Sequence, residues 1–320
     1  TINESLQRAE RLWQHRVHSI LDYSVEGQDD DDTLDHTAAE IITTIERARA
    51  HEFVPFSVFK PSGIAPVALL ERVSAHQTLD AEDEREWARV QDRFARICAA
   101  AAIAEAPVLV DAEESWVQQA IDDLVEAAMA RHNRGRAIVF NTVQLYRTDR
   151  LAYLHDAVAR ATEGGYRYGV KLVRGAYMEK ERARADAEGY ADPIQPDKAT
   201  CDRDFDVALR FCMDHLDHVA VMAGTHNESS SLLLARLVDE RGIARNDRRI
   251  WSAQLLGMSD NISHNLAAAG FNVAKYVPYG PVREVMPYLI RRAAENTSAL
   301  GQTGRELGLI MAERKRRKSA

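Results

Sequence analysis

Residues 107–140, PVLVDAEESWVQQAIDDLVEAAMARHNRGRAIVF, contain a strand, a helix and a second strand in direct succession. Pro107–Val110 and Ala137–Phe140 are short and apolar, which is typical of buried strands. A helix is predicted for Ser115–Ala130, because its apolar residues fall near one face: Trp116, Ile121, Leu124, Val125 and Ala128. The stretch therefore predicts a strand–helix–strand unit of the kind that builds parallel sheets.

The same alternation continues on both sides of this stretch. Six further strands are predicted, at Ser19–Val25, Phe53–Phe59, Gly169–Val173, Val219–Ala223, Ile250–Leu255 and Val273–Val277. Eight strands that alternate with helices favour an α/β fold closed as a (βα)8 TIM barrel. A doubly wound open sheet is the competing architecture, but the GxGxxG fingerprint and the GxxxxGK[ST] phosphate loop are both missing from the sequence. We also predict a helix at Asp204–Leu216, and either a solvated loop or a helix N-cap at Asp29–Asp32.

Length and composition limit the class of protein. The 320 residues suit one barrel with additions or two ordinary domains, and 46% hydrophobic residues exclude disorder for most of the chain. A formal net charge of −8 argues against nucleic-acid binding. We expect a single domain over residues 1–320, with a helical segment at 1–18 and a C-terminal tail at 299–320.

Cysteine and histidine usage gives no sign of a metal site. Cys98, Cys201 and Cys212 are an odd number without CxxC spacing, which indicates a reducing compartment. Histidine pairs occur at i,i+3 spacing, but no carboxylate or cysteine completes a ligand set, so we expect no metal. No window holds the roughly 18 consecutive apolar residues of a membrane span, so we expect no transmembrane segment.

Polar residues gather at the carboxyl ends of the predicted strands, where TIM barrels place their active sites. They are Lys60, Asp111, Glu113, Glu114, Asn141, Gln144, Lys171, Arg174, Tyr177, Thr225, His226, Asn227, Lys275 and Tyr276. A single polar residue at a strand end is usually just solvated. Contributions from six strand ends together predict a site of mixed charge for an anionic ligand.

The segment Val170–Tyr177 sharpens this prediction. Lys171 interrupts an apolar strand, so its charge must point into the barrel lumen or be paired. The small residues Gly175 and Ala176 would let a ligand approach the backbone, and Arg174 offers a planar donor fork suited to phosphate. A tight turn with a surface arginine is the alternative, and the spacing alone leaves both open. Thr225-His226-Asn227 is a compact donor cluster for phosphate or ribose oxygens.

A helix is predicted for Tyr288–Thr297, YLIRRAAENT. Its adjacent residues Arg291 and Arg292 lie about 100° apart around the helix axis, so they could hold a carboxylate from two sides. The alternative is a helix-surface ion pair with Glu295, worth about 0.3–0.5 kcal/mol.

These segments together resemble the proline dehydrogenase (proline oxidase) family. The resemblance rests on KLVRGAY at Lys171–Tyr177, THN at Thr225–Asn227 and YLIRRAAENT, in the family's order, and it covers about Ser19 to Ser298. It implies a distorted (βα)8 barrel with extra N-terminal helices and a final helix over the barrel mouth. It also implies FAD as cofactor and oxidation of L-proline to Δ1-pyrroline-5-carboxylate. Lys171 and Arg174 resemble the monofunctional, mitochondrial-type branch.

The resemblance also implies roles for single residues. Lys60, Arg291 and Arg292 match a trio that binds the substrate carboxylate, and Tyr276 and Tyr288 match residues that pack against the proline ring. Asp111 matches an acidic residue that orients Lys60, and Lys171 matches a cation near the flavin N5 edge, so we expect these two to be catalytic. Cofactor contacts are expected from Gln144, Lys171, Val173, Arg174, Gly175, Ala176, Thr225, His226, Asn227, Leu255 and Glu295.

The resemblance also implies an electron acceptor, a partner enzyme and a cellular location. The family passes electrons to a membrane quinone, and a separate pyrroline-5-carboxylate dehydrogenase would take the product. The implied location is cytoplasmic and peripheral to the inner membrane, or the mitochondrial matrix side in a eukaryote. Three alternatives stay open: a hydroxyproline dehydrogenase, a cofactor-free aldolase with a Schiff base on Lys171 or Lys275, and a non-catalytic sensor.

Overall fold

Eight parallel strands close into a barrel in the computed structural model, which describes residues 1–25, 27, 29–281, 308, 311 and 313–317. Each strand pairs with the next along the chain, and β8 pairs back with β1. The strands are β1 His18–Tyr23, β2 Phe56–Phe59, β3 Val108–Val110, β4 Val139–Gln144, β5 Tyr168–Val173, β6 Val219–Gly224, β7 Ile250–Leu255 and β8 Val273–Tyr279. The predicted (βα)8 barrel and its eight strands are confirmed.

Two strands run further than their apolar pattern indicated. β4 continues through polar residues to Gln144, and β8 continues through Pro278 to Tyr279. Neighbouring strands explain the extensions, because Gln144 lies in register with Val173 of β5 and Tyr279 with Tyr23 of β1. Backbone pairing with a neighbour therefore sets these ends, and side-chain hydropathy does not.

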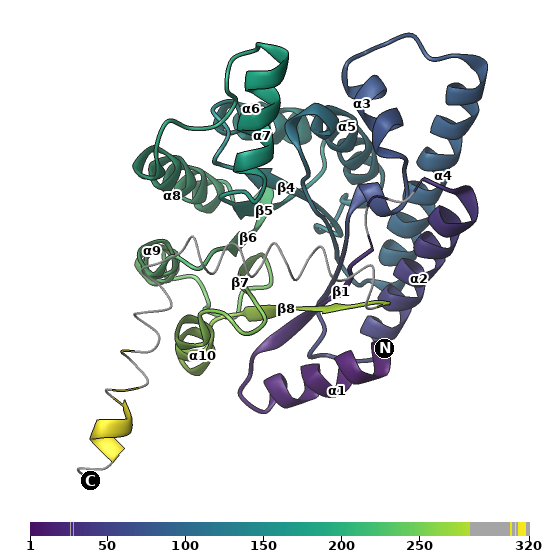
Figure 1. Ribbon diagram of the computed structural model, residues 1–320. Helices are drawn as coiled ribbons and strands as arrows, with labels where there is room; N and C mark the ends of the chain where they lie inside the picture. The colour runs from purple at the N-terminus through teal and green to yellow at the C-terminus, as the bar shows by residue number, and fades with distance from the viewer. Residues whose placement is uncertain (26, 28, 282–307, 309–310, 312, 318–320) are drawn as a thin grey trace.

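Helices surround the strands (Figure 1). They are α1 Ile2–Trp13, α2 Asp31–Arg49, the 3-10 turn η1 Pro61–Gly63, α3 Val67–Ser74, α4 Ala81–Ala104, α5 Ser115–His132, α6 Arg150–Glu163, α7 Met178–Glu188, α8 Lys198–Asp214, α9 Glu228–Glu240 and α10 Asp260–Ala268. Two helices follow β2 and two follow β5, whereas single helices follow the other connected strands.

Capping residues set the helix starts. Asp30 accepts a hydrogen bond from the Thr33 amide at 3.0 Å, so the acidic run Asp29–Asp32 opens α2 as the predicted N-cap. Asp197 accepts from the Thr200 amide at 2.7 Å and starts α8 six residues before the predicted Asp204. The helical N-terminal segment begins with a capping box between Thr1 and Glu4 and ends at Trp13.

The barrel has an apolar core on each side of its wall. Alternate strand residues point inward and fill the lumen with a cluster that includes Ile20, Phe56, Leu109, Phe140, Met222, Trp251 and Ala274. The intervening residues face the helices and form the larger core. The lumen below the mouth is therefore packed with side chains, and functional groups are confined to the inward positions above this cluster.

Part of the sequence lies outside the described residues. The predicted helix Tyr288–Thr297, its placement over the mouth and most of the tail 299–320 belong to that part. Within the described residues, no helix combines the length and the hydrophobicity that crossing a bilayer requires.

Candidate active site at the barrel mouth

The inward positions change from apolar to polar toward the strand carboxyl ends. On three strands a charged residue lies two positions after an apolar lumen residue: Asp22 follows Ile20, Lys60 follows Val58 and Asp111 follows Leu109. Lys171 holds the same inward side on β5, and Tyr276 closes the ring from β8. Because side chains alternate along a strand, this spacing brings charges from separate strands into one layer.

Asp111 is the centre of this layer. Its Oδ2 accepts a hydrogen bond from Lys60 Nζ at 2.9 Å, and its Oδ1 accepts one from Lys171 Nζ. Lys171 Nζ also donates to the Tyr276 hydroxyl at 2.6 Å. The structure thus brings together four residues that the sequence singled out, from β2, β3, β5 and β8.

Electrostatics fix the charges of this cluster. Burial opposes ionisation of Asp111, but Lys171 and Lys60 outweigh it and hold the pKa of the carboxyl well below its usual range. Burial lowers the pKa of Lys171, and the opposing effect of Asp111 favours its charged form. Asp111 is therefore a permanent anion that joins two lysines, and it is not a group that exchanges protons near neutral pH.

Glu113 anchors the turn that carries Lys60. Its Oε1 accepts from the Ser62 amide at 2.8 Å, and its Oε2 accepts from the Ser62 hydroxyl at 2.5 Å. Burial raises the pKa of Glu113 to about 7, against the lowering effect of Lys60. The sequence placed Glu113 in the polar ring, but the structure buries it behind η1, where it positions Lys60.

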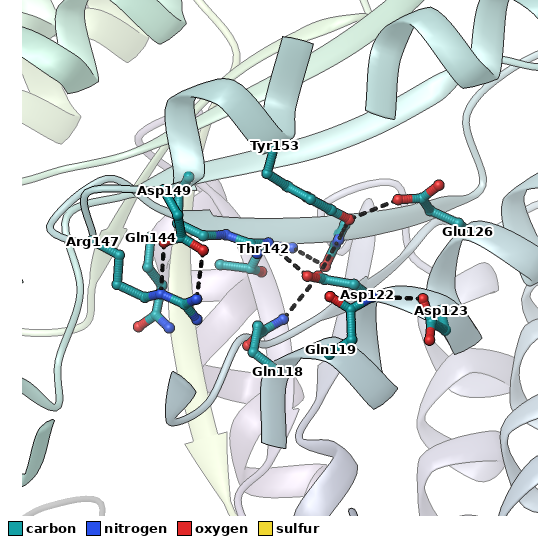
Figure 2. A network of polar contacts seen from close by, with 12 residues as sticks. Gln118, Gln119, Asp122, Asp123, Glu126, Thr142, Gln144, Arg147, Asp149 and Tyr153 are labelled. Carbon is teal, nitrogen blue, oxygen red and sulfur yellow. Dashed lines mark hydrogen bonds and ion pairs between the residues drawn. The ribbon is translucent and has the colours of Figure 1, made fainter. Parts of the chain in front are cut away.

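Gln144 is held by a polar network behind β3 and β4, and Figure 2 shows the part of this network around Gln118 and Asp122. Its amide nitrogen donates to the Glu113 carbonyl at 2.7 Å, and the Glu113 amide donates to Gln118 at 2.9 Å. Gln118 then donates a hydrogen bond to Asp122. Asp122 also forms an ion pair with Arg150 at 2.8 Å, and only 1% of the Asp122 side chain and 5% of the Arg150 side chain are exposed. The network fixes how Gln144 presents its amide to the lumen.

Two residues of the predicted ring face away from the lumen. Asn141 lies within β4 and donates to Asp122 at 2.8 Å and to Tyr153 at 3.0 Å, among the helices. Lys275 is fully buried on the outer side of β8, where it pairs with Asp260 at 2.8 Å and donates to the Met258 carbonyl. Both were placed wrongly, because the predicted strand ends did not reveal which residues alternate outward.

A second donor cluster lies beyond β5 and β6. Arg174 donates to Asp202 at 2.6 Å, to the Thr225 hydroxyl at 2.8 Å and to the Ser230 hydroxyl at 3.1 Å. Asn227 accepts from the Ser230 amide and caps α9. The surface-arginine alternative is therefore wrong, because Arg174 joins α8 to the start of α9.

The glycine in the loop after β5 is explained by packing, and not by the ligand approach that we expected. Gly175 has φ +141°, and a Cβ there would lie 2.3 Å from the Tyr146 ring. The glycine is thus needed by the packing of Tyr146, so a ligand is not required to explain it. Ala176 and Val173 beside it are half-buried, as is Leu255 at the end of β7.

The remaining predicted site residues are placed as follows. His226 is half-buried, with Nδ1 3.0 Å from the Ser259 hydroxyl. Tyr288, Arg291, Arg292 and Glu295 lie outside the described residues. In the described part of the chain, no three His, Cys, Asp or Glu side chains form a group that could hold a metal ion.

Asp22 is the lumen residue that the sequence reasoning missed. It is 3% exposed, and burial together with the charge of Asp111 raises its pKa to about 6, while Lys60 and Lys171 lower it. The signal was available, because Asp22 interrupts the apolar strand Ser19–Val25 as Lys171 interrupts its own strand.

Comparison with known proteins gives a consistent result. The family model for proline dehydrogenase matches residues 5–305. The chain is 35% identical over 318 residues to the carbapenem antibiotics biosynthesis protein CarD of Pectobacterium carotovorum subsp. carotovorum, covering 99% of this chain and 82% of CarD. It is 39% identical over 249 residues to mitochondrial proline dehydrogenase 1 of Caenorhabditis elegans, covering 76% and 40%. It is 39% identical over 230 residues to the hydroxyproline dehydrogenase of Xenopus laevis, covering 70% and 49%.

Solved structures show the same fold. Proline utilization A (PutA) from Bdellovibrio bacteriovorus, in a crystal structure of the form inactivated by N-propargylglycine, superposes with a TM-score of 0.82 at 16% identity. The match covers 93% of this chain and 32% of the PutA chain. The chain thus spans most of CarD, but less than half of the nematode protein and about a third of PutA.

Proposed function

Because the chain belongs to the proline dehydrogenase family, we propose that it is an FAD-dependent enzyme that oxidises L-proline to Δ1-pyrroline-5-carboxylate, the first step of proline catabolism. The observation that carries the proposal is the cluster of Lys60, Asp111, Lys171 and Tyr276 at the barrel mouth. It supplies cations for a carboxylate and an aromatic face beside them. The proposal treats residues 1–320 as one catalytic domain.

The substrate end of the site is built for an amino acid. Lys60, held by Asp111 and by the Glu113-anchored turn, offers a positioned ammonium to the proline carboxylate. The proposal assigns Arg291 and Arg292, which lie outside the described residues, to the same carboxylate, and Tyr276 and Tyr288 to the proline ring. The bidentate fork of arginine suits a carboxylate, and charge-assisted hydrogen bonds are the stronger kind.

The donor set fits FAD. The Arg174 guanidinium has five N–H donors, of which Asp202, Thr225 and Ser230 use three in the described part of the structure. Its remaining donors, with the Thr225–Asn227 segment, would hold the phosphates and the ribose chain. Gln144 would contact the flavin ring, Leu255 would form an apolar wall, and Val173 would add a further cofactor contact. Contacts to the FAD chain would come from Gly175, Ala176, His226 and, outside the described residues, Glu295. When bound, FAD supplies the acceptor for the hydride.

The chain's own residues supply position and charge. Lys171 places a buried cation where negative charge develops as the substrate is oxidised, and such a fixed charge is effective in a water-poor site. Asp111 keeps Lys171 ionised and orients Lys60. One carboxylate would therefore support both the cation near the flavin and the lysine that binds the substrate carboxylate. Tyr276, bonded to Lys171, couples the ring-packing surface to that cation.

Electron transfer and location are part of the proposal. We infer a membrane quinone as electron acceptor, with a separate dehydrogenase for the product. Mitochondrial names among the relatives support a mitochondrial location for a eukaryotic source. The proposal places the enzyme on the matrix side of the inner membrane in that case, and on the cytoplasmic side for a bacterial source. Lys171 and Arg174 support the monofunctional, mitochondrial-type branch.

The site residues bear differently on the two alternative activities, hydroxyproline oxidation and a Schiff-base aldolase. Hydroxyproline oxidation is favoured by the Xenopus relative. Proline is favoured by the role that the family resemblance gives Tyr276, which is to pack against the proline ring. The aldolase alternative loses Lys275, which faces away from the lumen. Its other lysine, Lys171, is paired with Asp111, whereas a Schiff base needs a neutral amine.

The test compares substrates on the purified protein loaded with FAD. Turnover of L-proline to a product lighter by two hydrogens, with a higher kcat/KM than for trans-4-hydroxyproline, supports the proposal. A higher kcat/KM for hydroxyproline would assign the alternative activity. Borohydride trapping of a carbonyl substrate on Lys171 would instead support the aldolase, and flavin binding without turnover would support the sensor.

A further inference from the structure

Among the described residues, three carboxyl groups lie at the barrel mouth in different surroundings: Asp22 and Glu113 are buried, and Asp111 is half-buried. Asp111 has one lysine on each oxygen. Glu113 has the Ser62 amide on one oxygen and the Ser62 hydroxyl on the other, behind the Lys60 turn. Both carboxylates are thus fully engaged by the protein in positioning Lys60 and Lys171.

Asp22 is placed differently from these two. It points into the lumen two residues beyond Ile20, in register with Val58 of β2 and Pro278 of β8. Within the part of the chain that the structure describes, no lysine or arginine forms an ion pair with it. Its polar neighbour Ser24 donates to the Asp22 backbone carbonyl at 3.3 Å.

The substrate of the proposed function brings a proton that the reaction must remove. A ring nitrogen that carries two hydrogens and a positive charge has no lone pair with which to form a carbon–nitrogen double bond. A nearby carboxylate that is ionised yet not locked in an ion pair is suited to take the proton. Asp22 is the described mouth carboxyl that meets this requirement.

We propose that Asp22 is the catalytic residue that accepts the proton from the substrate's ring ammonium. The inference rests on the proposed function and goes one step beyond it. A nitrogen–hydrogen bond breaks, and the proton binds an Asp22 oxygen. The nitrogen lone pair can then form the carbon–nitrogen double bond as the adjacent ring carbon loses a hydride, which bound FAD, the oxidant of the proposed function, would accept.

The charges that face Asp22 support this transfer. Lys60 from β2 and Lys171 from β5 raise the cost of a further positive charge, so they lower the pKa of a substrate ammonium between them. Asp111 from β3 repels a second ionised carboxylate and favours protonation of Asp22, and the Tyr279 hydroxyl from β8 lies within its field. With a pKa of about 6, Asp22 is ionised at neutral pH and still basic enough to accept.

The first test is the pH profile of kcat/KM for proline. In the unsubstituted enzyme the profile rises through about pH 6 and then levels. In Asp22→Asn we expect a loss of about 100-fold near neutral pH and no rise at about pH 6, with activity recovering toward about pH 10 as proline itself loses the proton. Asp22→Glu should restore the acid limb. An unchanged profile in Asp22→Asn would overturn the proposal.

The second test measures binding without turnover. The enzyme reduced with dithionite cannot accept a hydride, so proline affinity can be measured by calorimetry. We expect proline to bind more weakly as the pH falls below about 6, in the unsubstituted enzyme and not in Asp22→Asn. The analogue with the ring NH replaced by oxygen has no ammonium, so its affinity should not weaken. Equal weakening for both ligands would contradict a contact between Asp22 and the amine.

Ser24→Ala is a third test, and it does not depend on the stability of the Asp22 variants. Besides donating to the Asp22 backbone carbonyl, the Ser24 hydroxyl lowers the pKa of the Asp22 side chain, so its removal should move the acid limb to higher pH without abolishing it. A limb that stays in place contradicts the assignment. If proline fails to reduce the flavin at all, the proposed function fails. If it reduces the flavin with an unchanged profile in all variants, this inference alone fails.

Discussion

The acidic residues at the barrel mouth are of two kinds: one stays ionised, and the others can gain or lose a proton near neutral pH. Asp111 joins Lys60 and Lys171 and stays ionised, whereas Asp22 and Glu113 have pKa values raised to about 6 and about 7. The fixed anion sets the geometry of the two lysines. The exchangeable groups give the site a pH dependence that a lysine–aspartate pair alone would not produce.

Lys171 is expected to act mainly on the rate of the chemical step. In Lys171→Met, the buried cation near the developing negative charge is lost, so kcat should fall by about 100-fold or more. Steady-state kinetics at saturating proline measure this. Met is close in length and apolar, so the flavin spectrum of the loaded variant should show that cofactor binding is retained. A change confined to KM would contradict the role.

Arg292 is expected to act on substrate binding. Arg292→Met removes one arm of the carboxylate clamp, so KM for proline should rise by about 10-fold or more, in line with the cost of one charge-assisted hydrogen bond. Unchanged steady-state kinetics would exclude Arg292 from the clamp. Arg314→Met, in the basic tail, serves as a control with the same substitution.

At the scale of elements, the turn η1 and strand β4 are supported from behind. Glu113 holds η1, and the buried Asp122–Arg150 pair holds the network that leads to Gln144 (Figure 2). Breaking such a pair leaves an uncompensated buried charge, which is costly. Glu113, Asp122 and Arg150 therefore stabilise the fold and also hold the site residues in position.

Asp122→Asn should destabilise the protein by about 3 kcal/mol, because Arg150 loses its buried partner. Chemical denaturation measures the free energy of unfolding. Asp123→Asn is the matched control on the exposed face of the same helix, where its pairing with Gln119 contributes little. Equal effects from the two substitutions would contradict the importance of the buried pair.

Sequence reasoning predicted the elements better than the direction of their side chains. All eight strands were found because short apolar runs between helices are a local signal. Asn141 and Lys275 were misplaced because inward and outward faces depend on strand register, which pairing with neighbours decides. Lys60, Asp111, Lys171 and Tyr276 were found by their strand-end positions, but their mutual contacts come from barrel closure between distant segments.

At the level of the whole molecule, a chain with a formal net charge of −8 carries buried lysines at its barrel mouth. Closing the barrel brings Asp22 of the first strand beside Lys171 of the fifth, at a cost in burial energy for each ionised group. A site that carries such charges is less stable than an apolar mouth would be. Function and stability therefore oppose each other here.

Asp22→Asn should stabilise the fold at neutral pH. The pKa of Asp22 is higher in the folded state than in the unfolded chain, so its ionisation destabilises the fold fully above about pH 6 and not below about pH 4. The variant should gain about 1–3 kcal/mol at about pH 8 and nothing at about pH 4. Denaturation at both pH values measures this, and an equal gain at both would contradict a charge effect.

We propose that this barrel oxidises proline with a bound flavin, and flavin reduction by proline can be observed directly. The most direct measurement is an anaerobic titration of the FAD-loaded protein with L-proline, followed by its visible absorbance. We expect a yellow protein whose flavin bands bleach as proline is added. A protein that takes up no flavin, or whose flavin bands persist at saturating proline, would contradict it.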